Sequence, residues 1–102
     1  MTYNKLVRDR IPEIIQAKGG TCKTRILSDE EYVQKLDRKL GEELAEYLDS
    51  HNPEELADLL EVMYACAALQ SLTPADLDRI RAEKAAKRGG FADKILLIES
   101  EG

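Results

Sequence analysis

Hydrophobic residues recur at helical spacing between positions 32 and 47. At about 100° per residue, six of them form one stripe: Tyr32, Val33, Leu36, Leu40, Leu44 and Tyr47. Ser28 followed by Glu31 is a capping-box pattern, which favours a helix start. The pattern predicts a long amphipathic helix that ends near Asp49 and turns its apolar stripe toward the rest of the fold.

Two further long helices follow, and the sequence predicts them over residues 53–71 and 74–88. Asn52-Pro53 and Thr73-Pro74 each place a capping side chain directly before a proline, which is a favoured helix start. The second helix is apolar nearly all round after its first turns, which suits burial in an assembly. Because the break between the first two helices is short, we expect them to be antiparallel neighbours.

Shorter elements are predicted at both ends. Pro12 begins a short helix over residues 12–18, which Gly19-Gly20 stops. β-branched and apolar runs favour strands at 21–27 and 94–99, which can pair with each other. The expected fold class is therefore mainly all-α. It is one domain, residues 1–102, with an antiparallel bundle of three long helices, a short N-terminal helix and a small two-stranded β element.

Composition and charge limit the function. A formal net charge of −5 and the lack of Trp argue against general nucleic-acid binding, which needs a basic surface and aromatic platforms. No segment approaches the roughly 20 apolar residues that cross a bilayer, and the first residues do not resemble a signal peptide. Cys22 and Cys66 fit reduced thiols better than a disulfide or a metal pair. We expect a soluble, cytoplasmic protein without a nucleic-acid or membrane partner.

Four carboxylates are expected to meet where the first two long helices adjoin. Glu43 falls inside the apolar stripe, where a carboxylate is costly unless a cation compensates it. Glu46 lies about one helical turn after Glu43, so the two side chains can reach the same position. Glu55 and Asp58 share a face of the second helix. Oxygen-only ligands suit Mg²⁺ or Mn²⁺. The alternative is a solvated acidic face, in which Lys and Arg one turn away pair with these acids.

A basic group ends the third helix. Lys84 and Arg88 lie on the line of Leu77, which predicts that they face the fold. The amides of Gly89-Gly90 can approach an anion closely. These cations could neutralise phosphate next to a metal, or they could simply stabilise the carboxyl end of the helix dipole.

Three motifs occur in a fixed order: YNKLVRDRIPEII from Tyr3 to Ile15, EELAE at Glu42–Glu46 with ELAD at Glu55–Asp58, and KRGGF from Lys87 to Phe91. The central pair is similar to the EExxE and ExxD pattern of the MazG-like all-α nucleoside triphosphate pyrophosphohydrolase superfamily, which includes phosphoribosyl-ATP pyrophosphohydrolases. The opening and closing motifs resemble a small branch of that superfamily. The resemblance covers nearly the whole chain.

The resemblance implies an enzyme that converts a nucleoside triphosphate (NTP) and water into a nucleoside monophosphate (NMP) and pyrophosphate, with non-standard nucleotides as candidate substrates. The cofactor would be Mg²⁺, for which Mn²⁺ can substitute. Its implied ligands are Glu43, Glu46, Glu55 and Asp58. Glu42 and Glu43 would be the catalytic carboxylates, with Glu42 orienting or deprotonating the water. The phosphates would be bound by Lys84, Lys87 and Arg88. Because members assemble through their helices, we expect a homodimer or homotetramer.

Two alternatives stay open. A phosphoribosyl-ATP pyrophosphohydrolase is less favoured, because the opening motif resembles the other branch. A non-enzymatic, regulatory helical module would use the acids only as a solvated face. The eight residues between Glu46 and Glu55 are fewer than in many superfamily members, which leaves the substrate open.

Overall fold

The computed structural model describes residues 3–102 and is all-α, as the sequence predicts. Its four helices are α1 (Ile11–Ala17), α2 (Asp29–Ser50), α3 (Pro53–Leu69) and α4 (Pro74–Arg88). Met1 and Thr2, which begin the N-terminal segment that we expect to be irregular, lie outside the described residues. None of the described helices has an apolar stretch long enough to cross a membrane.

The three long helices begin at the predicted caps. The Ser28 hydroxyl accepts a hydrogen bond from the Glu31 N–H at 3.2 Å, and the Glu31 carboxylate accepts one from the Ser28 N–H at 3.1 Å. Asn52 caps α3, and Thr73 caps α4 through a second capping box. These bonds satisfy N–H groups that the first turn of a helix would otherwise leave unpaired. The turn between α2 and α3 is made by His51, whose φ of 54° is left-handed.

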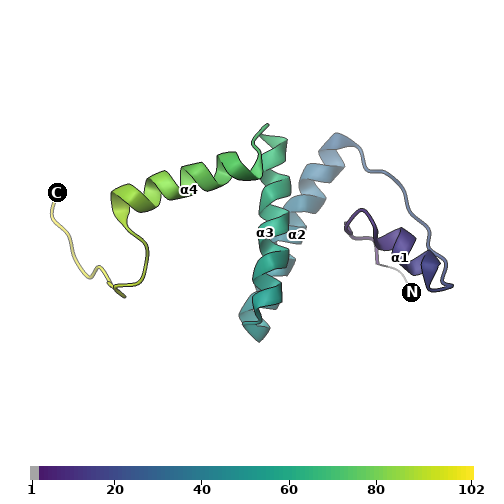
Figure 1. Cartoon of the computed structure of the whole chain (residues 1–102), viewed down its shortest axis with the longest axis horizontal. Helices are drawn as coiled ribbons and strands as arrows, with labels where there is room; N and C mark the ends of the chain where they lie inside the picture. Colours follow the sequence, from purple (N-terminus) through teal and green to yellow (C-terminus); the bar gives the residue numbers. More distant parts are fainter. Residues whose placement is uncertain (1–2) are drawn as a thin grey trace.

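Helices α2 and α3 lie side by side as a hairpin (Figure 1). The buried hydrophobic residues of the described chain are few and belong to this hairpin: Leu36, Val62 and Ala67. Glu43 is buried with them, as its place in the apolar stripe predicted. Val33 and Leu44, also on the stripe, are more than two-fifths exposed, so the hairpin covers only part of its own apolar surface.

Helix α4 leads away from the hairpin instead of lying along it (Figure 1). Within one chain, the expected antiparallel bundle of three long helices is therefore not formed. Helices α2 and α3 form a pair, and α4 projects from it. The physical reason is that α4 carries only two large aliphatic residues, Leu77 and Ile80, which are too few for a continuous apolar stripe. The radius of gyration is 18.0 Å, whereas a compact domain of this length has about 13 Å.

The two predicted strands are not formed. Residues 21–27 and 94–99 have no strand structure in the described chain, and they lie near opposite ends of its long axis (Figure 1). Ile26 is 95% exposed and Ile95 is 83% exposed. Strand propensity alone does not form a strand without a partner for its backbone groups, and the direction of α4 keeps the two segments apart.

Candidate metal centre

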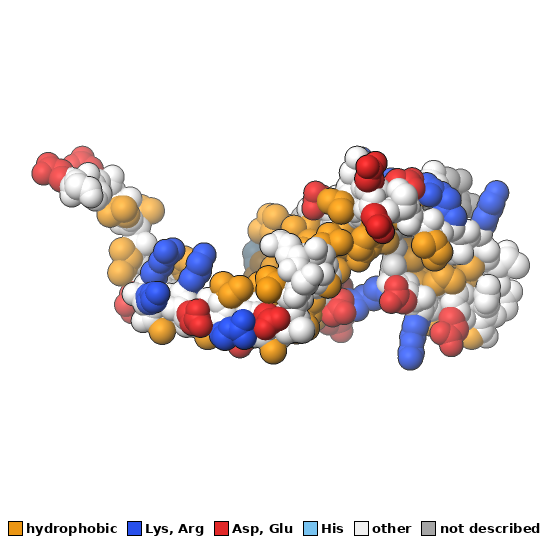
Figure 2. Space-filling model, turned by 90° about the horizontal axis from the view of Figure 1, so that it is seen from above, with side chains coloured by type: hydrophobic (Ala, Val, Ile, Leu, Met, Phe, Trp, Pro, Cys, Tyr) orange, Lys and Arg blue, Asp and Glu red, His pale blue; other side chains and the backbone are white. Residues whose placement is uncertain are grey.

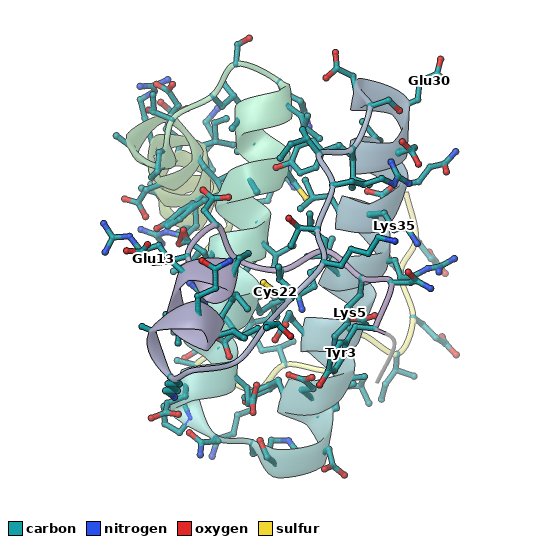
Figure 3. All side chains as sticks on the ribbon, turned by 90° about the vertical axis from the view of Figure 1, so that its right-hand side faces the viewer. Tyr3, Lys5, Glu13, Cys22, Glu30 and Lys35 are labelled. Carbon is teal, nitrogen blue, oxygen red and sulfur yellow. The ribbon has the colours of Figure 1, made fainter. Side chains whose placement is uncertain are left out.

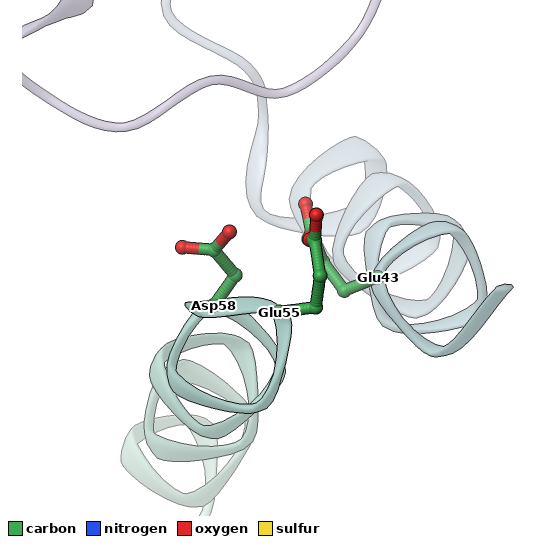
Figure 4. Close-up of side chains that lie close together, drawn as sticks. All are labelled: Glu43, Glu55 and Asp58. Atoms are coloured by element: carbon green, nitrogen blue, oxygen red, sulfur yellow. The ribbon is translucent and has the colours of Figure 1, made fainter. Parts of the chain in front are cut away.

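Three carboxylates from the two hairpin helices come together. Glu43 of α2 and Glu55 and Asp58 of α3 each offer one oxygen, and these oxygens lie within 4.8 Å of one another (Figure 4). Glu55 and Asp58 are three positions apart and therefore project from the same side of α3. The short turn at His51 brings the first turns of α3 next to the last turns of α2. We call Glu43, Glu55 and Asp58 the acidic cluster.

Glu43 is the most constrained member of the cluster. It is 7% exposed, and its Oε1 atom lies 3.4 Å from the Lys39 Nζ atom. Its Oε2 atom is buried and has no hydrogen-bond partner among the described residues. Burial, and secondly the charge of Glu46, raise the pKa of the Glu43 carboxyl above its ordinary value. A buried oxygen without a partner is unfavourable, and a cation at the cluster would relieve it.

The donor set fits a hard divalent cation. All three groups offer oxygen, which Mg²⁺ and Mn²⁺ prefer over nitrogen or sulfur. The unpaired Oε2 atom of Glu43 supplies an acceptor in a buried position. Lys39 contributes one compensating positive charge, which is shared with Glu42 at 3.8 Å. Lys39 lies against Oε1 of Glu43 and leaves its buried Oε2 atom unpaired, so the arrangement suits an additional cation.

Glu46 and Glu42 lie next to the cluster and not within it. Glu46 is exposed and does not belong to the three carboxylates that approach within 4.8 Å, although its charge acts on Glu43. Glu42 is half-buried and faces Lys39. Glu46 is three positions after Glu43, so the two carboxylates share a side of α2 and interact with each other.

A cation that sequence analysis did not assign to the site reaches the cluster from the N-terminal segment. The Arg8 Nη2 atom donates a hydrogen bond to the Asp58 Oδ1 atom at 2.7 Å, across a separation of 50 residues. Nearby, the Lys35 Nζ atom donates to the Asn4 carbonyl at 3.4 Å. The signal was present in the sequence, because Lys5, Arg8 and Arg10 are concentrated in the opening motif.

The predicted phosphate-binding cations lie elsewhere in the single chain. Lys84, Lys87 and Arg88 are exposed, near the end of α4 that projects away from the hairpin. Figure 2 shows basic side chains gathered along this projecting part of the molecule. The expectation that Lys84 and Arg88 face the fold is wrong for one chain, because α4 does not pack along the hairpin.

Comparisons with known proteins supply no function. No family model matches the chain, and no solved structure matches it. A protein of Mycolicibacterium smegmatis (strain ATCC 700084 / mc(2)155), described as uncharacterized, is 62% identical to the chain over 42 residues. The match covers 41% of this chain and 43% of that relative, so it spans less than half of either protein.

Proposed function

We propose that this protein is a Mg²⁺-dependent nucleoside triphosphate pyrophosphohydrolase, which cleaves NTP with water into NMP and pyrophosphate. The observation that carries the proposal is the buried Oε2 atom of Glu43, which has no hydrogen-bond partner in the described chain and belongs to a three-carboxylate cluster. The resemblance of the Glu42–Glu46 and Glu55–Asp58 motifs to the MazG-like pattern supports the reaction class. Non-standard nucleotides are included among the proposed substrates.

The residues divide into three roles. Glu43, Glu55 and Asp58 would hold the ion, with Glu46 as a fourth ligand recruited from its exposed position. Mg²⁺ bound there, or Mn²⁺ in its place, supplies Lewis-acid polarisation of phosphoryl oxygens and a lowered pKa for water. Glu42, half-buried beside the cluster, would orient the attacking water and accept its proton. Lys39 limits the mutual repulsion of the acids before a ligand binds.

We propose that the active form is a homodimer or homotetramer. The described chain leaves a groove lined mainly by apolar residues where α2, α3 and α4 meet, and its lining includes Leu40, Met63, Cys66, Leu72, Leu77 and Ile80. The chain is also extended, and much of its apolar surface is exposed. A second copy of this chain would bury that surface. In such an assembly the exposed Lys84, Lys87 and Arg88 would serve the phosphates at a neighbouring subunit's cluster.

The cysteines support a reducing compartment. Cys22 and Cys66 are both free thiols, and burial, together with the charge of Asp37, raises the pKa of the Cys66 thiol. A thiol with a raised pKa has less reactive thiolate at neutral pH. Reduced cysteines are typical of reducing compartments, and we propose the cytoplasm as the location.

The decisive experiment compares Glu55→Gln with Glu54→Gln. Glu55 belongs to the cluster, whereas its neighbour Glu54 is exposed in the same helical turn. Pyrophosphate release is measured with Mg²⁺ on a panel of canonical, deoxy and modified NTPs together with phosphoribosyl-ATP. We expect Glu55→Gln to lower kcat/KM at least about 100-fold, because a metal ligand contributes several kcal/mol to the transition state. Glu54→Gln should retain the wild-type rate.

Four results would reject or redirect the proposal. Equal rates in the two variants, or turnover that persists in EDTA, would reject the cluster as the metal centre. If phosphoribosyl-ATP is turned over and no NTP of the panel is, the protein is instead a phosphoribosyl-ATP pyrophosphohydrolase. The contacts of Lys39 with Glu43 and of Arg8 with Asp58 also suit a regulatory module whose charges are compensated within the chain. Calorimetry that detects no Mg²⁺ binding would favour that module.

A further inference from the structure

Arg8, from the N-terminal segment, contacts one member of the acidic cluster. Its guanidinium contacts Asp58 at 2.7 Å, and the side chains of Arg8 and Asp58 are 57% and 42% exposed. Asp58 therefore has one oxygen near Glu43 and Glu55 and also carries an ion pair to a residue outside the hairpin. A divalent cation bound to the cluster and the Arg8 guanidinium would compete for the same carboxylate.

The N-terminal segment that carries Arg8 crosses the same side of the hairpin. Residues 3–8 contain no helix, and the Asn4 carbonyl accepts a hydrogen bond from Lys35 of α2. Figure 3 shows Lys5 and Lys35 on this side of α2. Six residues gather here, of which four are basic: Lys5, Leu6, Lys35, Arg38, Lys39 and Glu42. Positive charge is thus arranged next to the acidic cluster, within one chain.

The chemistry of this arrangement is that of a metal–phosphate site. A guanidinium has five N–H donors in a planar fork that matches phosphate oxygens. Arg8 makes one side-chain hydrogen bond within the described residues, to Asp58, so most of its donors remain for a ligand. An exposed ion pair contributes little to stability. The Arg8–Asp58 contact is therefore readily exchanged for a stronger, charge-assisted contact with a polyphosphate.

We infer that Arg8 is a transferable counter-ion: it pairs with Asp58 in the metal-free chain and pairs with the phosphate oxygens of the ligand once Asp58 binds the cation. The ligand class is a divalent cation with a di- or triphosphate. This inference rests on the proposed function, and it adds a phosphate-binding residue from the N-terminal segment to the basic residues of α4. It requires that Arg8 weaken the binding of metal alone and strengthen the binding of metal with phosphate.

The test measures both bindings in the full chain with Arg8→Gln and the control Arg10→Gln. Arg10 is exposed, lies two residues away and makes no side-chain capping bond to α1. Mn²⁺ alone is titrated by electron paramagnetic resonance. We expect Arg8→Gln to bind Mn²⁺ about two- to fivefold more tightly, which is the size of an exposed ion pair. In saturating Mg²⁺, calorimetry should show at least about tenfold weaker binding of inorganic pyrophosphate, since a charged hydrogen bond is lost.

The outcomes separate this inference from the proposed function. Arg10→Gln should change neither affinity, and Arg8→Lys should restore part of the pyrophosphate affinity. If Mn²⁺ binds to the wild type and Glu43→Gln removes that binding, but Arg8→Gln alters neither affinity, the metal centre stands and the role of Arg8 is rejected. A loss of both affinities in Arg8→Gln would assign Arg8 a structural role instead. If the wild type binds no Mn²⁺, both proposals are overturned.

Discussion

Glu43 combines two properties that rarely occur together in a small hairpin. It is buried, and one of its oxygens lacks a hydrogen-bond partner in the described chain. Most buried polar atoms are paired, so such an exception requires a physical reason. Cation binding supplies one, because the charge that destabilises the metal-free chain becomes favourable when a divalent ion is held nearby.

At the residue scale, we predict that Glu43→Gln stabilises the metal-free protein. In EDTA at pH 7, the free energy of unfolding should rise by about 1 kcal/mol, because a buried charge with an unpaired oxygen is replaced by a neutral amide. The variant should also lose the stabilisation that Mg²⁺ confers on the wild type. Urea denaturation with and without Mg²⁺ measures both effects. Glu61→Gln, an exposed site on α3, serves as the control, and a Glu43→Gln variant that still responds to Mg²⁺ would contradict the assignment.

Several side-chain hydrogen bonds stabilise the amino-terminal end of α2. Glu31 belongs to the capping box with Ser28, and the Arg25 guanidinium holds the same carboxylate at 2.6 and 3.0 Å. The hydrogen bond from Arg25, followed by that from the Ser28 N–H, lowers the pKa of Glu31 to about 2. This network anchors the amino end of the helix that carries Glu43.

At the element scale, these hydrogen bonds predict that the stability of α2 decreases in acid. Since the folded pKa of Glu31 lies below its ordinary value of 4.5, the stabilisation is complete above that value and is lost as the pH falls toward about 2. Urea denaturation between pH 6 and pH 2 should show the decline, and Glu31→Gln should flatten it. Glu30→Gln, the adjacent exposed acid, should leave the slope as in the wild type. Equal slopes in all three proteins would show that the capping box has no such role.

The whole molecule is open, and few of its hydrophobic residues are buried. The buried hydrophobic residues of the described chain are Leu36, Val62 and Ala67. Phe91 is 99% exposed, and the run from Ile95 to Ile98 is more than three-quarters exposed at every position. A domain of this size already buries a modest share of its surface, so the open shape favours assembly with further copies.

At the scale of the whole molecule, we predict an oligomer that depends on the apolar groove. Sedimentation should give a mass at least twice the 11.5 kDa of one chain. Ile80→Glu places a charge in the groove and should shift the protein toward monomer and lower its Tm. Ala82→Glu introduces the same side chain two positions later, on the opposite side of α4, and should preserve the mass. A wild-type protein that sediments as a monomer would refute the proposed assembly.

Local sequence signals determined the parts of this protein that depend on neighbouring residues. The caps at Ser28, Asn52 and Thr73, the short break after α2 and the inward position of Glu43 were all predicted from local patterns of residues. The sequence predicted that Glu43, Glu46, Glu55 and Asp58 meet, because a short turn makes two helices neighbours. The structure groups three of them, Glu43, Glu55 and Asp58, and leaves Glu46 beside the group.

Tertiary structure alone decided the rest. The contact between Arg8 and Asp58 joins residues 50 positions apart, and helical periodicity carries no information about such a pair. Packing between elements determines the direction of α4. It also determines whether residues 21–27 and 94–99 pair as strands, which they do not. Short-range interactions thus specify which helices form, whereas long-range packing decides which charges meet.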